Sequence, residues 1–217
     1  MNNRGIFIAV EGPIGVGKTT LANILNQHFG YTLLREIVEE NPFLSKFYTD
    51  IKEYALQTEA FFLFNRFKQL EDTEKNVLSK SKGVVSDYHI IKNLIFAGIT
   101  LDKMQFHRYK QVYNIFVNDL PQPDIIIYLN SNTDVLMKRI AMRDRSFERQ
   151  MDRNYIDGLR TEYKYYFNPL SIKHNFMGKE PIIIEIDNSN LEEDRKFIID
   201  KVEEAISTLG GKTTCSN

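Results

Sequence analysis

The sequence lacks what several protein classes require. Its 217 residues include a single cysteine, Cys215, so the chain cannot form an internal disulfide or a cysteine metal cage. Lysine and arginine (28) are balanced by aspartate and glutamate (29), which leaves a formal net charge of −1. Proteins that coat DNA, RNA or anionic membranes need an excess of basic residues. We therefore expect no nucleic acid and no membrane among its partners.

Long apolar segments are also missing. The first apolar run, over residues 6–10, ends at Glu11 and is too short for a signal-peptide core or a membrane span. No repeat, low-complexity block or linker rich in proline, glycine or serine divides the chain. The sequence therefore predicts a cytoplasmic protein with one domain over residues 1–209 and a flexible C-terminal tail over 210–217.

Short apolar runs alternate with longer amphipathic stretches along the chain. The runs are rich in β-branched residues, which is typical of strands buried on both faces of a parallel sheet, and they cover 6–10, 31–34, 84–85, 125–129 and 182–186. The apolar spacing of helices occurs over 18–29, 51–71, 104–118, 133–143, 154–167 and 191–209. This alternation predicts an α/β fold with a five-stranded parallel sheet flanked by helices.

A glycine-rich loop connects the first predicted strand to the first predicted helix. The segment 12–19 matches the pattern G-x-x-x-x-G-K-[ST], whose backbone N–H groups cradle phosphates. Lys18 is expected to reach the transferred phosphoryl group, and the hydroxyl of Thr19 is expected to bind Mg²⁺. The motif predicts a nucleotide site without deciding between a motor, a switch and a kinase. The residues expected to hold the donor here are Gly12, Pro13, Ile14, Gly15, Val16, Gly17, Lys18, Thr19 and Thr20.

An arginine-rich segment follows the fourth predicted strand and its helix. Arg139, Arg143 and Arg145 lie in a stretch, 138–153, with six positive and three negative residues. Arginines placed over a transferring phosphoryl group stabilise its negative charge. In a chain with a phosphate loop, the segment therefore predicts a mobile lid over about 139–153. The alternative is a solvated helix end whose charges pair with one another.

Several motifs, taken together, resemble the deoxynucleoside kinase family and in particular its bacterial deoxyguanosine kinases. Each later motif is weak alone, but their order and spacing are specific, and they extend over most of the chain. They are the phosphate loop, Glu36, the segment 41–48, the segments 57–59 and 65–68, Asp87-Tyr-His, and the pattern R-x-x-x-R-x-R-x-x-E over 139–148.

The resemblance implies a P-loop kinase fold and roles for the matching residues. Glu36 matches the general base for the sugar 5′-hydroxyl, and Tyr48 and Glu148 match the pair that holds the 3′-hydroxyl. Asp87 matches the acid that organises Mg²⁺ together with Thr19. The resemblance also implies that Asp187 and Asn188 lie near the donor adenine, that Phe96 stacks on the nucleoside base, and that the protein is a homodimer packed through helices including 104–118.

One position departs from the family pattern. Most members carry an arginine and a serine after the acid that Asp87 matches, whereas Tyr88 and His89 follow it here, as in the deoxyguanosine kinase branch. The arginine that usually supports the catalytic carboxylate is therefore absent. The sequence does not show which residue replaces it.

The residue at position 59 carries the prediction of base specificity. Relatives that take cytosine, adenine or thymine usually have glutamine there, whereas the carboxylate of Glu59 can only accept hydrogen bonds. Guanine presents two adjacent donors, N1–H and the N2 amino group, which suit a carboxylate. Arg66 lies two helical turns further on the same face and could donate to guanine O6 and N7. The amide of Asn93 could add a donor toward O6. These residues predict a deoxyguanosine kinase that uses MgATP.

Three alternatives remain at this stage. A deoxyadenosine or broad deoxypurine kinase is disfavoured by Glu59. A thymidylate-like monophosphate kinase would need a second phosphate-binding arginine near the base helix, and would place Glu36 beside an anionic substrate. A P-loop regulatory protein usually carries a guanine-reading N-K-x-D loop, and this chain has none.

Overall fold

The fold is a three-layer arrangement around a parallel sheet. The computed structural model describes residues 4–149, 151–168, 171, 180–188 and 191–211. Five parallel strands lie in the order β2-β3-β1-β4-β5, which confirms the predicted sheet. Their bounds are β1 Phe7–Glu11, β2 Thr32–Leu34, β3 Val84–Ser86, β4 Ile125–Asn130 and β5 Ile182–Asp187. In the centre, Ile8 of β1 pairs with Val85 of β3 on one side and Ile125 of β4 on the other.

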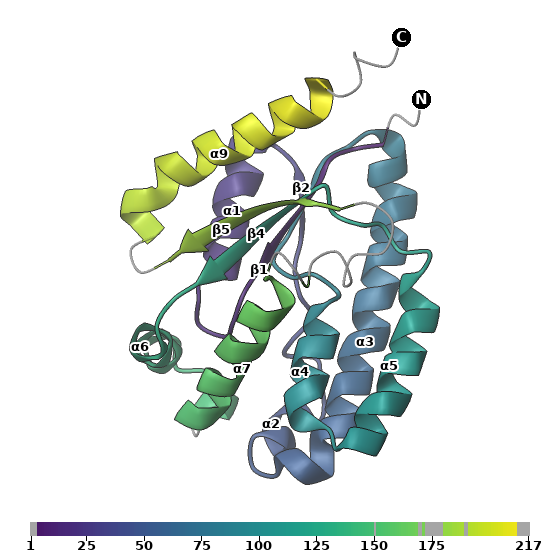
Figure 1. Cartoon of the computed structure of the whole chain (residues 1–217), viewed down its shortest axis with the longest axis vertical. Coiled ribbons are helices and arrows are strands. Elements are labelled where there is room, and N and C mark those ends of the chain that lie inside the picture. The colour runs from purple at the N-terminus through teal and green to yellow at the C-terminus, as the bar shows by residue number, and fades with distance from the viewer. Residues whose placement is uncertain (1–3, 150, 169–170, 172–179, 189–190, 212–217) are drawn as a thin grey trace.

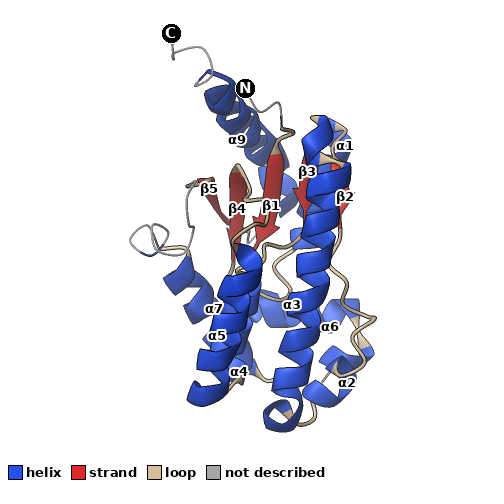
Figure 2. Cartoon of the chain, turned by 90° about the vertical axis from the view of Figure 1, so that its right-hand side faces the viewer, coloured by secondary structure: helices blue, strands red, loops and turns tan. Residues whose placement is uncertain are grey.

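Helices cover the sheet in two groups. They are α1 Lys18–Phe29, α2 Leu44–Phe47, α3 Ile51–Asn76, α4 Lys92–Thr100, α5 Lys103–Val117, α6 Thr133–Arg143, α7 Arg153–Tyr166 and α9 Leu191–Gly211, with short 3₁₀ turns at Leu78–Lys80 and Ser146–Glu148. Helix α1 packs on β1, β2 and β3, and α9 packs on β5. Helices α3, α4 and α5 pack against one another, and α4 also packs against α7 (Figures 1 and 2).

The helix boundaries agree with the sequence pattern where the helix is amphipathic. Helices α1 and α6 have the predicted bounds, whereas α3 continues to Asn76 rather than ending at residue 71. The sequence pattern did not predict α4. Most of its side chains are buried, from Lys92 and Asn93 in its first turn to Thr100 at its end, so it shows no polar face. Helix α4 therefore lacks the amphipathic spacing by which a helix is recognised in a sequence.

The C-terminal boundary differs slightly from the expectation. Helix α9 continues through Gly211, two residues beyond the predicted end of the domain, and residues 212–217 lie outside the described part. No helix among the described residues combines the length and apolar character needed to cross a membrane.

The ends of the strands place the candidate site. All five strands are parallel, so their C-terminal ends lie along one edge of the sheet. In open α/β sheets, ligands bind in the crevice outside this edge. The phosphate loop follows β1, Glu36 follows β2, Asp87 follows β3 and Asn188 follows β5.

Candidate active site

The phosphate loop has the backbone that its glycines permit. Gly12 has φ +150° and Gly17 has φ +98°, conformations that L side chains rarely adopt. A Cβ added to Gly12 would lie 2.2 Å from the carbonyl oxygen of Leu129 in β4, so the close approach of these backbones needs glycine. The loop ends at the N-terminus of α1, whose first residue is Lys18. This is the geometry of an anion site at a helix N-terminus.

Lys18 bends back over the loop. Its Nζ donates to the carbonyl oxygens of Gly12 at 2.7 Å and Pro13 at 2.9 Å. Burial, followed by repulsion from Lys92, lowers the pKa of Lys18 to about 7. A phosphate brought next to this amine would favour its charged form, so Lys18 is poised to pair with an anionic ligand.

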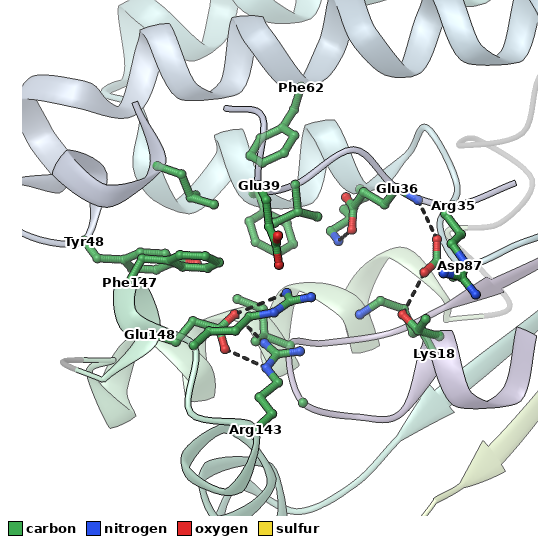
Figure 3. Close-up of a pocket in the computed structure, with 18 of the residues that line it drawn as sticks. Lys18, Arg35, Glu36, Glu39, Tyr48, Phe62, Asp87, Arg143, Phe147 and Glu148 are labelled. Atoms are coloured by element: carbon green, nitrogen blue, oxygen red, sulfur yellow. Dashed lines mark hydrogen bonds and ion pairs between the residues drawn. The ribbon is translucent and has the colours of Figure 1, made fainter. Parts of the chain in front are cut away.

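Asp87 joins the ends of two neighbouring strands to α1. Its Oδ2 accepts a hydrogen bond from Thr19 Oγ1 at 2.7 Å, and its Oδ1 accepts from the backbone N–H of Glu36 at 2.7 Å (Figure 3). The two residues predicted to organise Mg²⁺ are therefore neighbours. A hydroxyl and one carboxylate suit Mg²⁺, which keeps several waters and binds substrate phosphates as well. Among the described residues, no three His, Cys, Asp or Glu side chains gather into a metal cage.

Glu36 is held between two cations. Its Oε1 accepts a hydrogen bond from Arg66 Nη2, and its Oε2 accepts from Lys92 Nζ at 2.8 Å. The side chains of all three are less than a tenth exposed. Burial alone would raise the pKa of Glu36, but the charges of Lys92 and Arg66 outweigh burial and lower it to about 2. Glu36 is therefore a carboxylate at any physiological pH.

A cavity of ≈ 900 Å³ extends from the phosphate loop to α3 and α4. Most of the predicted site residues line it, but Gly12, Pro13, Val16, Asn93 and Asp187 do not. Those that do are Ile14, Gly15, Gly17, Lys18, Thr19, Thr20, Glu36, Tyr48, Glu59, Arg66, Asp87, Phe96, Arg139, Arg143, Arg145 and Glu148.

Glu59 and Arg66 present unpaired polar atoms at the α3 wall of the cavity. Glu59 is 2% exposed; its Oε1 accepts from Thr100 Oγ1 at 3.3 Å, and its Oε2 has no hydrogen-bond partner. Burial raises the pKa of Glu59 to about 7, although Arg66 opposes this. Arg66 keeps Nε and Nη1 unpaired, and its guanidinium lies 4.7 Å from the ring centre of Phe62. Such buried orphans indicate a polar ligand.

Asn93 lies behind the wall of the cavity and does not line it. It is fully buried, and its Nδ2 donates to Tyr109 Oη at 2.8 Å. The Tyr109 hydroxyl donates its one proton to the backbone carbonyl of Glu59, with an O···O distance of 3.2 Å, so it must accept from the asparagine amide. One of the two N–H donors of the Asn93 amide is thus used behind the wall, where it supports the backbone at Glu59 through Tyr109.

The predicted lid arginines lie on the opposite side of the cavity. Arg143 donates from Nε at 2.6 Å and from Nη2 to the carboxylate of Glu148, and Arg145 Nη1 lies 3.9 Å from the same group. The ring of Tyr48 stacks on Phe147 with centroids 6.1 Å apart and planes 8° apart (Figure 3). Burial, then the charge of Glu148, raises the pKa of Tyr48, so its hydroxyl remains a donor. The mobility of this segment stays a prediction.

Asn188, rather than Asp187, lines the cavity. Asp187 ends β5 with an exposed side chain, whereas Asn188 is buried and donates from Nδ2 to the carbonyl of Val16. The backbone carbonyl of Asn188 accepts from Arg139 Nη1 at 2.9 Å. The twofold alternation of a strand carries past its end, since Ile186 and Asn188 point inward and Asp187 outward. That alternation was the signal in the sequence that distinguishes Asn188 from Asp187.

Other lining residues escaped the sequence analysis, and Lys92 is the most consequential. A lysine inside the apolar stretch 90–95 signals a buried charge that needs a partner. Apart from Asn188, the additional lining residues are Arg35, Val38, Glu39, Glu40, Leu44, Phe47, Thr58, Phe62, Lys92, Met142, Phe147 and Tyr155.

Comparisons with known proteins identify the family. The family model described as deoxynucleoside kinase matches residues 8–207. The deoxyguanosine kinase of Bacillus subtilis is 49% identical over 162 residues, which cover 75% of this chain and 78% of that protein. The deoxyadenosine/deoxycytidine kinase of the same organism is 29% identical over 211 residues, 94% and 93% of the two chains.

Solved structures agree with the sequence comparison. The structure of deoxyadenosine kinase from M. mycoides with bound dATP superposes with a TM-score of 0.79 at 25% identity, over 91% of this chain and 99% of that one. The fold is therefore the P-loop kinase fold that the resemblance implied. Relatives named for guanine and for adenine nucleosides are both similar, so the base is left open. The chain belongs to the deoxynucleoside kinase family, ATP-dependent kinases that act on a nucleoside hydroxyl.

Proposed function

We propose that this kinase transfers the γ-phosphoryl of MgATP to the 5′-hydroxyl of deoxyguanosine, as a purine deoxynucleoside salvage enzyme. The observation that carries the proposal is Glu59, a buried carboxylate with an unpaired oxygen on the wall of the cavity. The 49% identity to a deoxyguanosine kinase supports the same choice.

The hydrogen-bonding chemistry of this wall suits guanine. Ionised Glu59 would accept from N1–H and from the N2 amino group, and Nε and Nη1 of Arg66, which have no hydrogen-bond partner, would donate to O6 and N7. Adenine has a lone pair at N1 and would leave the buried carboxylate without its partner, at a cost of about 1–3 kcal/mol or more. The rings of Phe62 and Phe96 line the same cavity and supply apolar surface for the base.

Glu36 receives the proton of the 5′-hydroxyl in this proposal. An alcohol loses its proton readily only once its oxygen has begun to bond to phosphorus, and the transition state of phosphoryl transfer is loose. A carboxylate with a low pKa therefore orients the hydroxyl first and accepts the proton late. Tyr48 and Glu148 hold the 3′-hydroxyl, while Lys18, with Arg139, Arg143 and Arg145, stabilises charge on the phosphoryl group.

Thr19 and Asp87 are the proposed protein ligands of Mg²⁺, directly or through water. The ion would arrive with ATP and neutralise charge on the donor phosphates. Because Asp87 also accepts from the backbone N–H of Glu36, the same carboxylate holds the base next to the metal site.

We further propose that the protein is a cytoplasmic homodimer. Helix α5 exposes Val112 and Ile115, and Phe64 of the neighbouring α3 is also exposed and packs edge-on against Phe116. A second copy packed on this apolar face would cover it, in line with the family resemblance. Light scattering should give twice the chain mass, and Ile115→Lys should give the monomer mass.

The decisive test of base specificity is a set of initial rates with MgATP and each deoxynucleoside, on wild type and Glu59→Gln. The expected result is a preference for deoxyguanosine that the variant loses, with a gain for deoxyadenosine or deoxycytidine. Similar wild-type rates with deoxyguanosine and deoxyadenosine, both above the rates with pyrimidine deoxynucleosides, would favour the second candidate, a broad deoxypurine kinase, which the M. mycoides deoxyadenosine kinase neighbours also favour.

A further inference from the structure

Lys92 is a buried lysine in the first turn of α4, at the wall of the cavity. Its side chain is 8% exposed, its Nζ lies 2.8 Å from Glu36 Oε2, and the same nitrogen lies 5.2 Å from the ring centre of Phe96. Nothing in the sequence motifs pointed to this residue. Burying a lysine costs free energy unless a partner compensates for its lost hydration, and that partner here is Glu36.

The residue directly after Asp87 cannot support Glu36. Tyr88 is fully buried, and its hydroxyl donates to Gln69 Oε1 at 3.0 Å, toward α3. It brings no charge to the carboxylate. Lys92 starts the next helix after the same turn, and its side chain returns to the end of β2 where Glu36 lies. The cation that contacts Glu36 therefore comes from Lys92, four residues after Tyr88.

We propose that Lys92 is the positioning residue of the catalytic carboxylate, holding Glu36 Oε2 so that the carboxylate faces the 5′-hydroxyl of the nucleoside. This inference rests on the proposed role of Glu36 as proton acceptor. Each carboxylate oxygen has two lone-pair sites, so the bonds from Lys92 and Arg66 leave one site on each oxygen for substrate.

The two cations beside Glu36 do different work. Arg66 has Nε and Nη1 left over for the base, whereas among the described residues the Lys92 ammonium hydrogen-bonds to Glu36 alone. Lys92 is also the largest of the charges that lower the pKa of Glu36. Losing Lys92 should therefore impair the chemical step more than nucleoside binding.

The test compares Lys92→Met and Lys92→Arg with wild type, using Lys75→Met, an exposed lysine on α3, as the matched control. We expect Lys92→Met to lower kcat by roughly 10- to 100-fold while KM for deoxyguanosine changes less than about threefold. Lys92→Arg, which keeps the charge, should recover most of kcat. Rates are normalised to folded protein by circular dichroism. If Lys92→Met does not fold, Lys92→Gln takes its place.

A kcat for Lys92→Met within about threefold of wild type would overturn the proposal, as would an arginine variant no better than the methionine variant. A purely structural lysine would lower the folded fraction and leave kcat of the folded enzyme unchanged.

A double variant separates this inference from the function on which it rests. If Lys92 acts through Glu36, adding Lys92→Met to Glu36→Gln should cost little further activity. Additive losses would show that Lys92 acts elsewhere, for example on the phosphates, and would overturn the positioning role. If Glu36→Gln itself keeps the wild-type kcat, the proposed proton acceptor is wrong, and the preference for deoxyguanosine is still judged separately with Glu59→Gln.

Discussion

Arg66 and Glu36 form a buried ion pair, although 30 residues separate them in the chain. The pair connects the two ends of the cavity. Nη2 of Arg66 holds the carboxylate that faces the phosphate loop, and Nε and Nη1 remain available toward the wall that carries Glu59. One guanidinium would therefore contact the base of a bound nucleoside and also hold the carboxylate that accepts the proton of its 5′-hydroxyl.

Replacing Arg66 should damage both stability and activity. Arg66→Met leaves Glu36 buried with Lys92 alone, and breaking a buried pair typically costs about 3–5 kcal/mol of folding free energy. We expect the free energy of unfolding, measured with denaturant, to fall by about that amount and kcat/KM for deoxyguanosine to fall at least 100-fold. Lys68→Met, on the exposed face of the same helix, should change neither by much. If Arg66→Met and Lys68→Met had the same free energy of unfolding and the same kcat/KM, Arg66 would not connect Glu36 to the base-binding wall.

Base selectivity should depend on pH through Glu59. Its raised pKa, about 7, means that the carboxyl is neutral below that pH and ionised above it. The neutral form carries an O–H donor, which opposes guanine N1–H and suits adenine N1. The groups that interact with it include Arg66, Thr100, Lys92 and Glu36, and the tyrosines Tyr48, Tyr109 and Tyr155. We expect the ratio of kcat/KM for deoxyguanosine over deoxyadenosine to rise between pH 6 and 8, with a midpoint near pH 7.

The control for this titration is Glu59→Gln, whose amide does not ionise. Its selectivity ratio should be flat over the same range. Because kcat/KM reports the ionisation of the free enzyme, a wild-type ratio that is also flat would show that Glu59 does not change charge between pH 6 and 8 or does not read the base.

Asp87 should control the requirement for Mg²⁺. Asp87→Asn keeps the shape of the side chain but removes the charge that faces Thr19 and the backbone of Glu36. We expect the half-saturating concentration of free Mg²⁺ to rise and kcat to fall by roughly 10-fold or more, and chelation with EDTA to abolish activity in both proteins. An unchanged Mg²⁺ dependence in Asp87→Asn would remove Asp87 from the metal site.

The 3′-hydroxyl should be read by Glu148 and Tyr48. Wild type is expected to turn over 2′,3′-dideoxyguanosine with kcat/KM reduced about 10-fold or more, because the hydrogen bonds of the 3′-hydroxyl to buried Glu148 and to Tyr48 would be missing. Glu148→Gln should lower kcat/KM for deoxyguanosine, and should bring it closer to kcat/KM for 2′,3′-dideoxyguanosine. Arg149→Met, whose side chain pairs with Asp144 outside the cavity, serves as control. An undiminished difference in Glu148→Gln would exclude this contact.

The sheet and the phosphate loop were determined by local sequence. Runs such as 125–129 are apolar throughout because β4 is buried on both faces, and the glycines at 12 and 17 accept backbone angles that other residues avoid. Helices with one apolar face could also be predicted from the sequence, and α1 and α6 begin and end where predicted. These features depend on neighbours a few residues apart.

The partners of the site residues were decided only by the tertiary structure. Glu36 meets Arg66 from 30 residues away and Lys92 from 56, and Asn93 turns its amide to Tyr109 instead of the cavity. The sequence alone identified the carboxylate but not the lysine that holds it. The physical reason is that a buried charge is stabilised by whichever opposite charge the packed helices bring within hydrogen-bonding distance. That pairing follows from the arrangement of α3 and α4 on the sheet, and no local pattern encodes it.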